Sequence, residues 1–319
     1  MIEIKDSTKV VGKNLKLMIW GATGTRKTES VLRNFPHVLV FDSEGNVEQC
    51  VGVPEIKPFR YIQSKDTREA LEIIDQVSNG KILMQDGAKV ETLCFDSASV
   101  LWSVQQEVAS SLAEKRALKY NRDATTATTT QIDWTVAKRP LKNLLTKLNN
   151  SGIKYVILIA REKDLYADLP GNELKKIGVQ PDVVKGADYE MNLVLHTVAD
   201  GDKWYCEVTK PQGAIGQDMP KGKKFDRFPF DLIAKQTSGK TSVNPEKTDH
   251  EIALSQVQDE EDASEPHTME AMIAFARMLD IETSDIGKIL KAGGIGEFLP
   301  NRWTEMKTIL EKSQEVVVV

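Results

Sequence analysis

The chain has 319 residues, enough for one α/β domain of ordinary size and a smaller unit. Its 40% hydrophobic and 28% charged residues are typical of a globular protein, and a net charge of −5 neither excludes nor indicates nucleic acid as a partner. Cys50, Cys94 and Cys206 lack C-x-x-C spacing, which argues against a disulfide framework. The sequence shows neither an apolar run of membrane-spanning length nor the apolar core of a signal peptide, so we expect no membrane partner and a cytoplasmic location.

The strongest signal is a short apolar stretch that enters a small polar loop and then a helical pattern. It runs from Leu15 to Thr28 and reads LKLMIWGATGTRKT, which predicts a strand, a phosphate loop and a helix. In such a loop, backbone N–H groups and a helix N-terminus face the phosphates, Lys27 reaches the terminal phosphates, and Thr28 binds Mg²⁺. The predicted cradle consists of Gly21, Ala22, Thr23, Gly24, Thr25, Arg26, Lys27, Thr28 and Glu29.

The match to G-x-x-x-x-G-K-[ST] has one departure, because Arg26 stands at the second glycine position. An arginine there needs a permissive backbone conformation or a side chain that points away from the nucleotide. Two interpretations follow. Either the site binds and hydrolyses ATP with Mg²⁺, or it binds nucleotide as a switch without turnover. An ordinary turn that happens to contain these residues is the third reading of the stretch.

Two further apolar stretches end in acidic residues. Residues 38–46 read VLVFDSEGN, and residues 91–99 read ETLCFDSAS. The carboxyl ends of parallel strands form the ligand-binding edge of open α/β sheets. We therefore expect Asp96 to serve the metal and Glu44 to polarise the attacking water.

The segments GATGTRKT, FDSEG and LCFDSAS resemble the ATPase core of the RecA/RadA superfamily, and more closely phage-encoded members of the Sak type of single-strand-annealing recombinases. The resemblance covers about residues 15–235 and is specific at these three segments. It implies an α/β fold, a RecA-like P-loop NTPase core with a mostly parallel sheet flanked by helices and a β-hairpin extension. It also implies a slow, DNA-stimulated ATPase that uses ATP and Mg²⁺, assembles as a homo-oligomer, and works with a single-strand-binding protein in a bacterial host cytoplasm.

Periodicity predicts the remaining elements in chain order. We expect helices over residues 27–34, from residue 67, over residues 99–118 and from Asp133 to Leu148, and strands over residues 154–160, 191–198 and 203–209. The buried stripe of the helix over residues 99–118 is predicted to be Val100, Leu101, Val104, Val108 and Leu112. The Thr-rich tract before Asp133 and the stretch 162–188 are predicted to be loops.

The resemblance implies that two loops face single-stranded DNA. The basic candidates and one aromatic candidate for stacking are Lys119, Tyr120, Arg122, Lys138, Arg139, Lys175 and Lys176. The alternative for these residues is a solvated helix end and a linker, because charges at helix ends are common.

Two more residues receive roles from the resemblance. Arg161 ends a predicted buried strand, where the family places a polar sensor of the terminal phosphate; the alternative is an ion pair with Glu44 or Asp96. Lys210 follows the predicted hairpin and corresponds to a residue that reaches the nucleotide of a neighbouring subunit; the alternative is an ordinary surface lysine.

Composition divides the chain into a core over residues 1–235, an acidic linker over residues 236–267 and a small helical module over residues 268–319. The sequence thus favours an ATP-dependent protein that binds single-stranded DNA and promotes annealing or recombination. Two alternatives remain, a P-loop motor or loader that acts on a protein, and a non-hydrolysing nucleotide switch that recruits partners.

Overall fold

The computed structural model describes residues 14–169, 173–201, 203–213, 215–237, 269–279, 281–296, 299 and 302–315. They divide into two compact units, within residues 1–246 and 247–319. Most of the expected acidic linker, residues 238–267, lies outside the described residues, so the three-part division stays a prediction. Within the described residues, no helix has the length and apolar character needed to cross a membrane.

The first unit is built on a nine-stranded sheet of order β3-β2-β4-β5-β1-β7-β8-β9, with β6 paired to β5. The strands are β1 Leu15–Gly21, β2 Val38–Asp42, β3 Arg60–Gln63, β4 Thr92–Asp96, β5 Tyr155–Leu169, β6 Glu173–Pro181, β7 Leu193–Asp200, β8 Lys203–Pro211 and β9 Lys224–Phe225. The strands from β3 to β7 in this order pair in parallel, and the pairs that contain β6, β8 or β9 are antiparallel. The expected mostly parallel sheet with a hairpin extension is confirmed.

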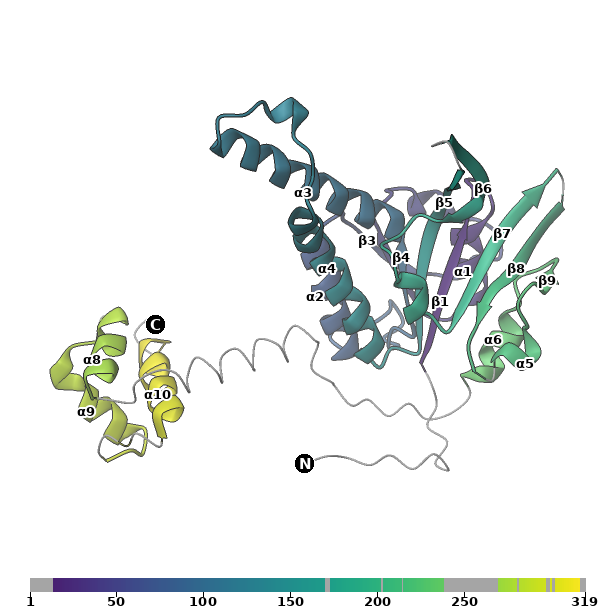
Figure 1. Ribbon diagram of the computed structural model, residues 1–319. Helices are drawn as coiled ribbons and strands as arrows, with labels where there is room; N and C mark the ends of the chain where they lie inside the picture. Colours follow the sequence, from purple (N-terminus) through teal and green to yellow (C-terminus); the bar gives the residue numbers. More distant parts are fainter. Residues whose placement is uncertain are drawn as a thin grey trace. The chain divides into compact units, whose positions relative to one another are not determined.

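Helices cover both faces of the sheet (Figure 1). The helices of this unit are α1 Lys27–Asn34, η1 Val47–Cys50, α2 Thr67–Ser78, α3 Ala98–Lys119, η2 Ala124–Thr126, α4 Gln131–Asn150, η3 Ala187–Glu190, α5 Ile215–Asp218 and α6 Phe230–Gln236. Helices α2, α3 and α4 pack on one face through one apolar cluster, and α1, α5 and α6 pack on the other through a second. The central strands are buried on both faces, which explains why β1, β2 and β4 appear in the sequence as continuous apolar runs.

The sequence places the buried face of α3 incorrectly. Val108 is 38% exposed, whereas Ala109, Ala113 and Ala117 are buried and lie on the side that packs against α4. Because alanine side chains are small, they allow two helices to approach closely. A prediction that looks for large apolar side chains overlooks them.

The two predicted loops are also corrected. The stretch 162–188 forms the far part of β5, the antiparallel strand β6 and the turn η3. The Thr-rich tract contains η2, and Thr130, not Asp133, caps α4: Thr130 Oγ1 accepts from the Asp133 N–H while Asp133 accepts from the Thr130 N–H. This capping box leaves Asp133 inside the first turn of the helix.

In the part of the second unit that the structure describes lie three short helices, α8 Met269–Met278, α9 Thr283–Ala292 and α10 Trp303–Glu315. Their buried residues form a separate apolar cluster that includes Met272, Leu290 and Met306. The buried core that these helices share is small.

Candidate nucleotide site

The loop between β1 and α1 begins at a glycine that no other residue can replace without movement. A Cβ on Gly21 would lie 2.2 Å from the carbonyl oxygen of Thr197 and 2.6 Å from its Oγ1. Thr197 is on β7 and lies opposite Gly21 in the parallel register. The glycine therefore lets β1 pass close to β7 just where the chain leaves the sheet.

Hydrogen bonds to β7 and β8 fix the loop. The hydroxyls of Thr25 and Thr197 are 2.8 Å apart, and Trp204 Nε1 donates to the Thr25 carbonyl over 2.8 Å. Thr25 is buried. These contacts give the loop a defined shape before any ligand binds, which favours binding because less order has to be imposed.

Lys27 is folded over this loop. Its Nζ donates to the carbonyl oxygens of Gly21 at 2.9 Å and Ala22 at 2.6 Å. Burial lowers the pKa of Lys27, and the nearby carboxylates of Asp96 and Glu44 oppose that effect. The ammonium is thus held at the centre of the loop, where a phosphate group would be its strongest available partner.

Arg26 takes the permissive conformation that its position requires. Its φ of 56° and ψ of 29° are left-handed, and its side chain is exposed. Such a conformation costs a non-glycine residue about 1–2 kcal/mol. The departure from the glycine pattern therefore preserves the loop backbone at a cost in stability.

The first turn of α1 meets the end of β4. Thr28 Oγ1 donates to Asp96 Oδ2 over 2.5 Å, and Asp96 is 7% exposed. Burial raises the pKa of Asp96 to about 6, against the hydrogen bond from Thr28. A hydroxyl and a carboxylate side by side are the hard oxygen ligands that Mg²⁺ prefers, so the two residues fit the metal expected there.

The loop after β2 is held in place by Asp42, the last residue of β2, and by a backbone hydrogen bond to β4. Asp42 is buried and accepts from the N–H groups of Glu44, Gly45 and Val47 at 2.8–3.1 Å. The Ser43 N–H donates to the Asp96 carbonyl over 2.7 Å. Glu44 is thereby fixed beside Asp96, as the sequence predicts from the two acidic strand ends.

The Glu44 carboxylate has two donors. Ser97 Oγ is 2.6 Å and Arg161 Nε 2.9 Å from Glu44 Oε1. Burial disfavours the charge, but the bonds from Arg161 and Ser97 outweigh it and hold the pKa of Glu44 below its ordinary value. Of the two interpretations of Arg161, the ion pair with Glu44 is the contact that this structure contains.

A cavity of about 250 Å³ is lined by most of the residues predicted for the nucleotide site, but not by Gly21 and Ala22. Its walls include Thr23, Gly24, Thr25, Arg26, Lys27, Thr28, Glu29, Glu44, Asp96 and Arg161. Sequence reasoning missed Asn46, Gln49 and Cys50, which also line it, and Ser97, which binds Glu44. The feature of the sequence that could have identified Asn46 and Ser97 is their position within the two acidic segments, residues 38–46 and 91–99.

Lys210 lies elsewhere. It is opposite Val194 on β7, toward the end of the sheet away from Gly21 and Thr197. Its Nζ donates to the Asp188 carbonyl over 2.5 Å and lies 5.5 Å from the centre of the Tyr189 ring. Lys210 is therefore not part of the cavity in its own chain.

The DNA candidates occupy two projections from the sheet. Lys119, Tyr120 and Arg122 lie at the far end of the α3–α4 hairpin, where all three are exposed (Figure 1). On α4, Arg139 is exposed, while Lys138 lies half-buried with its Nζ 5.6 Å from the Trp134 ring centre.

The second projection is the β5–β6 hairpin. Lys175 and Lys176 are exposed on β6, and Lys176 pairs with Asp164 at 2.5 Å. The structure therefore separates the basic candidates into two groups on different elements, neither of which lines the nucleotide cavity.

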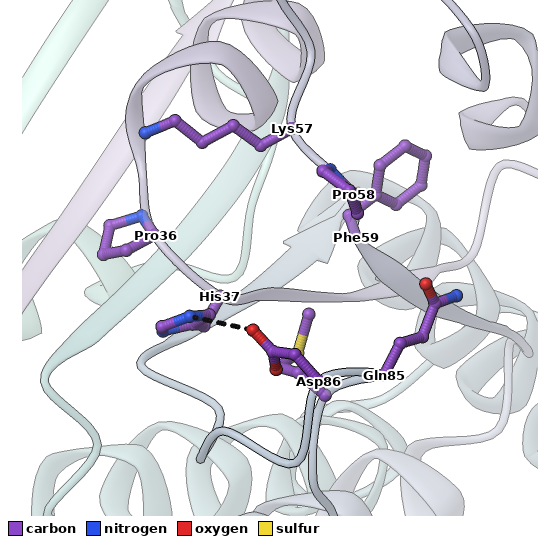
Figure 2. A pocket seen from close by; sticks show the side chains of 8 residues that line it. Pro36, His37, Lys57, Pro58, Phe59, Gln85 and Asp86 are labelled. Atoms are coloured by element: carbon purple, nitrogen blue, oxygen red, sulfur yellow. Dashed lines mark ion pairs between the residues drawn. The ribbon is translucent and has the colours of Figure 1, made fainter.

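A larger cavity, of about 400 Å³, lies where β2 and β3 begin. Figure 2 shows Pro58 and Phe59 on one side of it and His37 and Asp86 on the other, with His37 Nε2 3.8 Å from Asp86 Oδ2. It contains none of the site residues predicted from the sequence.

The fold and the first cavity define an α/β domain in which a strand, a glycine-containing loop and a helix border the cavity. No protein-family model and no curated protein matches the chain. Among solved structures, the chain is similar to the RadB recombinase, with 11% identity over 66% of this chain and 84% of that one and a TM-score of 0.36. It is also similar to the flagellar accessory protein FlaH from Methanocaldococcus jannaschii, with 13% identity, coverage of 67% and 84%, and a TM-score of 0.35.

Proposed function

We propose that the protein is a P-loop ATPase that binds ATP with Mg²⁺ and hydrolyses it slowly. The observation that carries the proposal is the meeting of Lys27, Thr28 and Asp96 at the open end of the loop. A cation for phosphate, a hydroxyl and a carboxylate for metal, and a glycine-containing loop before a helix N-terminus are the parts that phosphoryl transfer requires.

Each residue has a distinct task in this proposal. The loop from Gly21 to Glu29 holds the phosphates, with Lys27 neutralising the terminal ones. Thr28 and Asp96 hold Mg²⁺, which when bound neutralises charge on the transferring phosphoryl group. Glu44 orients the attacking water and accepts its proton.

In this proposal Arg161 can pair either with Glu44 or with the terminal phosphate of the nucleotide. It now binds Glu44, and its side chain, which is 54% exposed, lines the same cavity. A terminal phosphate offers more charge and bidentate geometry than one carboxylate oxygen, so a bound nucleotide draws Arg161 toward the phosphate.

The same contact favours a second candidate function. While Arg161 holds Glu44, the carboxylate is engaged, and nucleotide binding without turnover would make the site a switch. Turnover distinguishes the two, because a switch binds ATP and releases no phosphate.

We further propose that single-stranded DNA is the partner. The support is the pair of basic projections, with Tyr120 63% exposed among Lys119 and Arg122. An exposed aromatic ring stacks on any base, and the surrounding cations bind the phosphates, which suits sequence-tolerant binding. Annealing or strand pairing is the activity that such a protein would serve.

Assembly completes the proposal. Lys210 cannot reach the nucleotide cavity of its own chain, so a role in hydrolysis requires a neighbouring copy of the protein, as in a homo-oligomer with ATP between subunits. The helices of the second unit offer a place for a further partner, such as a single-strand-binding protein.

Gel retardation of an unstructured oligonucleotide tests the DNA partner. Single-stranded and duplex DNA of equal length are titrated with the protein, with and without ATP and Mg²⁺, at low and moderate salt. We expect preferential retardation of the single strand that weakens steeply with salt, because binding releases counterions. Absence of retardation at low salt with ATP present would remove the DNA proposal and leave an ATPase that acts on a protein.

A further inference from the structure

The two donors to Glu44 bind the same oxygen. Ser97 Oγ and Arg161 Nε both lie within 2.9 Å of Oε1, and no side chain in the described part of the chain donates to Oε2. Two donors on one oxygen fix the rotation of the carboxylate about its last torsion, which is otherwise broad and roughly two-fold. Oε2 is therefore the oxygen that remains to accept a hydrogen bond from water.

We infer that Ser97 is a positioning residue for hydrolysis, which anchors Glu44 by Oε1 so that Oε2 faces the attacking water. This inference rests on the ATPase function proposed above and adds to it a residue that touches neither phosphate nor metal. Ser97 is not among the residues that line the cavity.

Ser97 is better suited than Arg161 to be the permanent anchor. Ser97 is fully buried, and its backbone is tied to β2: its N–H donates to Ser43 Oγ, and its carbonyl accepts from the same hydroxyl, both at 2.9 Å. Arg161 has a long side chain that is about half exposed. When Arg161 moves to the phosphate, the hydrogen bond from Ser97 keeps Glu44 in place, because its donor cannot move.

The contact also has a favourable chemical character. A hydrogen bond from a buried hydroxyl to a carboxylate is stronger than one between neutral groups, whereas a half-exposed ion pair is weakened by solvent. Removing the hydroxyl therefore leaves Glu44 attached only to Arg161, so that it follows the guanidinium away from the position of the water.

The test is a double-mutant cycle on ATP hydrolysis by the full chain. Ser97→Ala should lower kcat by roughly tenfold to a hundredfold and leave the affinity for ATP unchanged. In a Glu44→Ala background the same replacement should cost nothing further, since the group that Ser97 positions is gone. Ser151→Ala is the matched control: Ser151 is also buried, but its hydroxyl donates to the Leu148 carbonyl at the end of α4, so kcat should not change.

Each other outcome is decisive. An equal loss of kcat from Ser97→Ala with and without Glu44, or no loss at all, would overturn the positioning role while the ATPase stands. If wild-type protein releases no phosphate, the proposed function and this inference fail together. Should Ser97→Ala not fold, Ser97→Cys keeps the side-chain volume with a weak donor and must lower kcat in the same way.

Discussion

Thr28 and Asp96 are 68 residues apart in the chain, yet their side-chain oxygens are 2.5 Å apart. The contact joins the first turn of α1 to the carboxyl end of β4, beside the loop that holds Lys27. It places a buried carboxylate where its negative charge is costly to the stability of the fold. Under the proposed function the same charge would bind Mg²⁺, so that stability and function would depend on Asp96 in opposite ways.

Asp96→Asn should stabilise the protein without ligand near neutral pH. The pKa of Asp96 in the folded chain is raised to about 6, so the folded chain holds a proton that the unfolded chain releases at lower pH. Stability accordingly falls as the pH rises from about 4 to about 6, and the cost of the charge is complete above that window. We expect the variant to gain about 1–3 kcal/mol at about pH 7.5 and little at about pH 4.

Denaturant unfolding at the two pH values measures this difference. Asp75→Asn is the control, because Asp75 is half exposed on α2 and pairs with Lys147. No gain for Asp96→Asn at the higher pH would show that Asp96 does not carry a buried charge.

Arg26→Gly should relieve the left-handed backbone at the start of α1. Glycine adopts a φ of 56° freely, while alanine keeps the cost of a side chain there. We expect the Gly variant to be about 1 kcal/mol more stable than Arg26→Ala, which carries the same loss of charge. Thermal unfolding of the pair measures the difference, and equal midpoints would mean that the conformation at Arg26 is unstrained.

The Arg26→Gly variant also tests the effect of Arg26 on the rate of ATP hydrolysis. If Arg26 serves only as an imperfect glycine, Arg26→Gly hydrolyses ATP at least as fast as the wild type. A slower Gly variant with unchanged ATP affinity would instead assign a catalytic task to the arginine side chain.

Glu44→Gln should separate binding from hydrolysis. The amide keeps the size of the side chain and its acceptor for Ser97 and Arg161 but cannot take a proton from water. A fall of roughly a hundredfold in the rate of phosphate release is expected, with ATP binding retained. Glu48→Gln is the control, since Glu48 is exposed, accepts from the Tyr61 hydroxyl and is not among the residues that line the cavity. An unchanged rate in Glu44→Gln would remove Glu44 from the mechanism.

The proposed DNA-binding surface can be tested by removing positive charge from the projection formed by α3 and α4. Replacing Lys119, Arg122, Lys138 and Arg139 together by alanine should weaken binding to single strands and reduce the salt dependence of log K by up to about 3. A matched set of four exposed lysines, Lys57, Lys65, Lys81 and Lys89, lies in connecting segments of the same unit. Fluorescence anisotropy with a labelled oligonucleotide compares the two sets. Equal losses of affinity for the oligonucleotide in the two sets would mean that DNA does not bind at the α3–α4 projection.

The sequence predicts which segments end at the carboxyl edge of the parallel sheet, because the signals there are local. Gly21, Lys27 and Thr28 follow one strand directly, and the two acidic segments each follow another. Parallel strands necessarily bring such ends to one edge. That rule places Glu44 and Asp96 at the same edge of the sheet, and they are close to one another because β2 and β4 are neighbours.

Contacts between segments that are distant in the sequence cannot be predicted from the sequence alone. The role of Thr197 depends on which strand lies beside β1, and the hydrogen bond from Ser97 to Glu44 depends on the register of β2 against β4. The sequence predicts a loop over residues 162–188 because this stretch contains two prolines and three glycines and has no clean periodicity, yet most of it forms the β5–β6 hairpin. A two-stranded projection exposes both faces, so the alternation that marks a half-buried strand is missing.

Phosphate release from ATP by the purified full-length protein tests the central claim most directly. The wild type is assayed with Mg²⁺, with and without a single-stranded oligonucleotide, beside Lys27→Ala and the control Lys147→Ala, whose lysine pairs with Asp75 on the outside of α2. Slow release by the wild type and by Lys147→Ala, stimulated by DNA, and none by Lys27→Ala is the result that a P-loop ATPase predicts. Release that persists in Lys27→Ala, or no release by the wild type under any of these conditions, would contradict it.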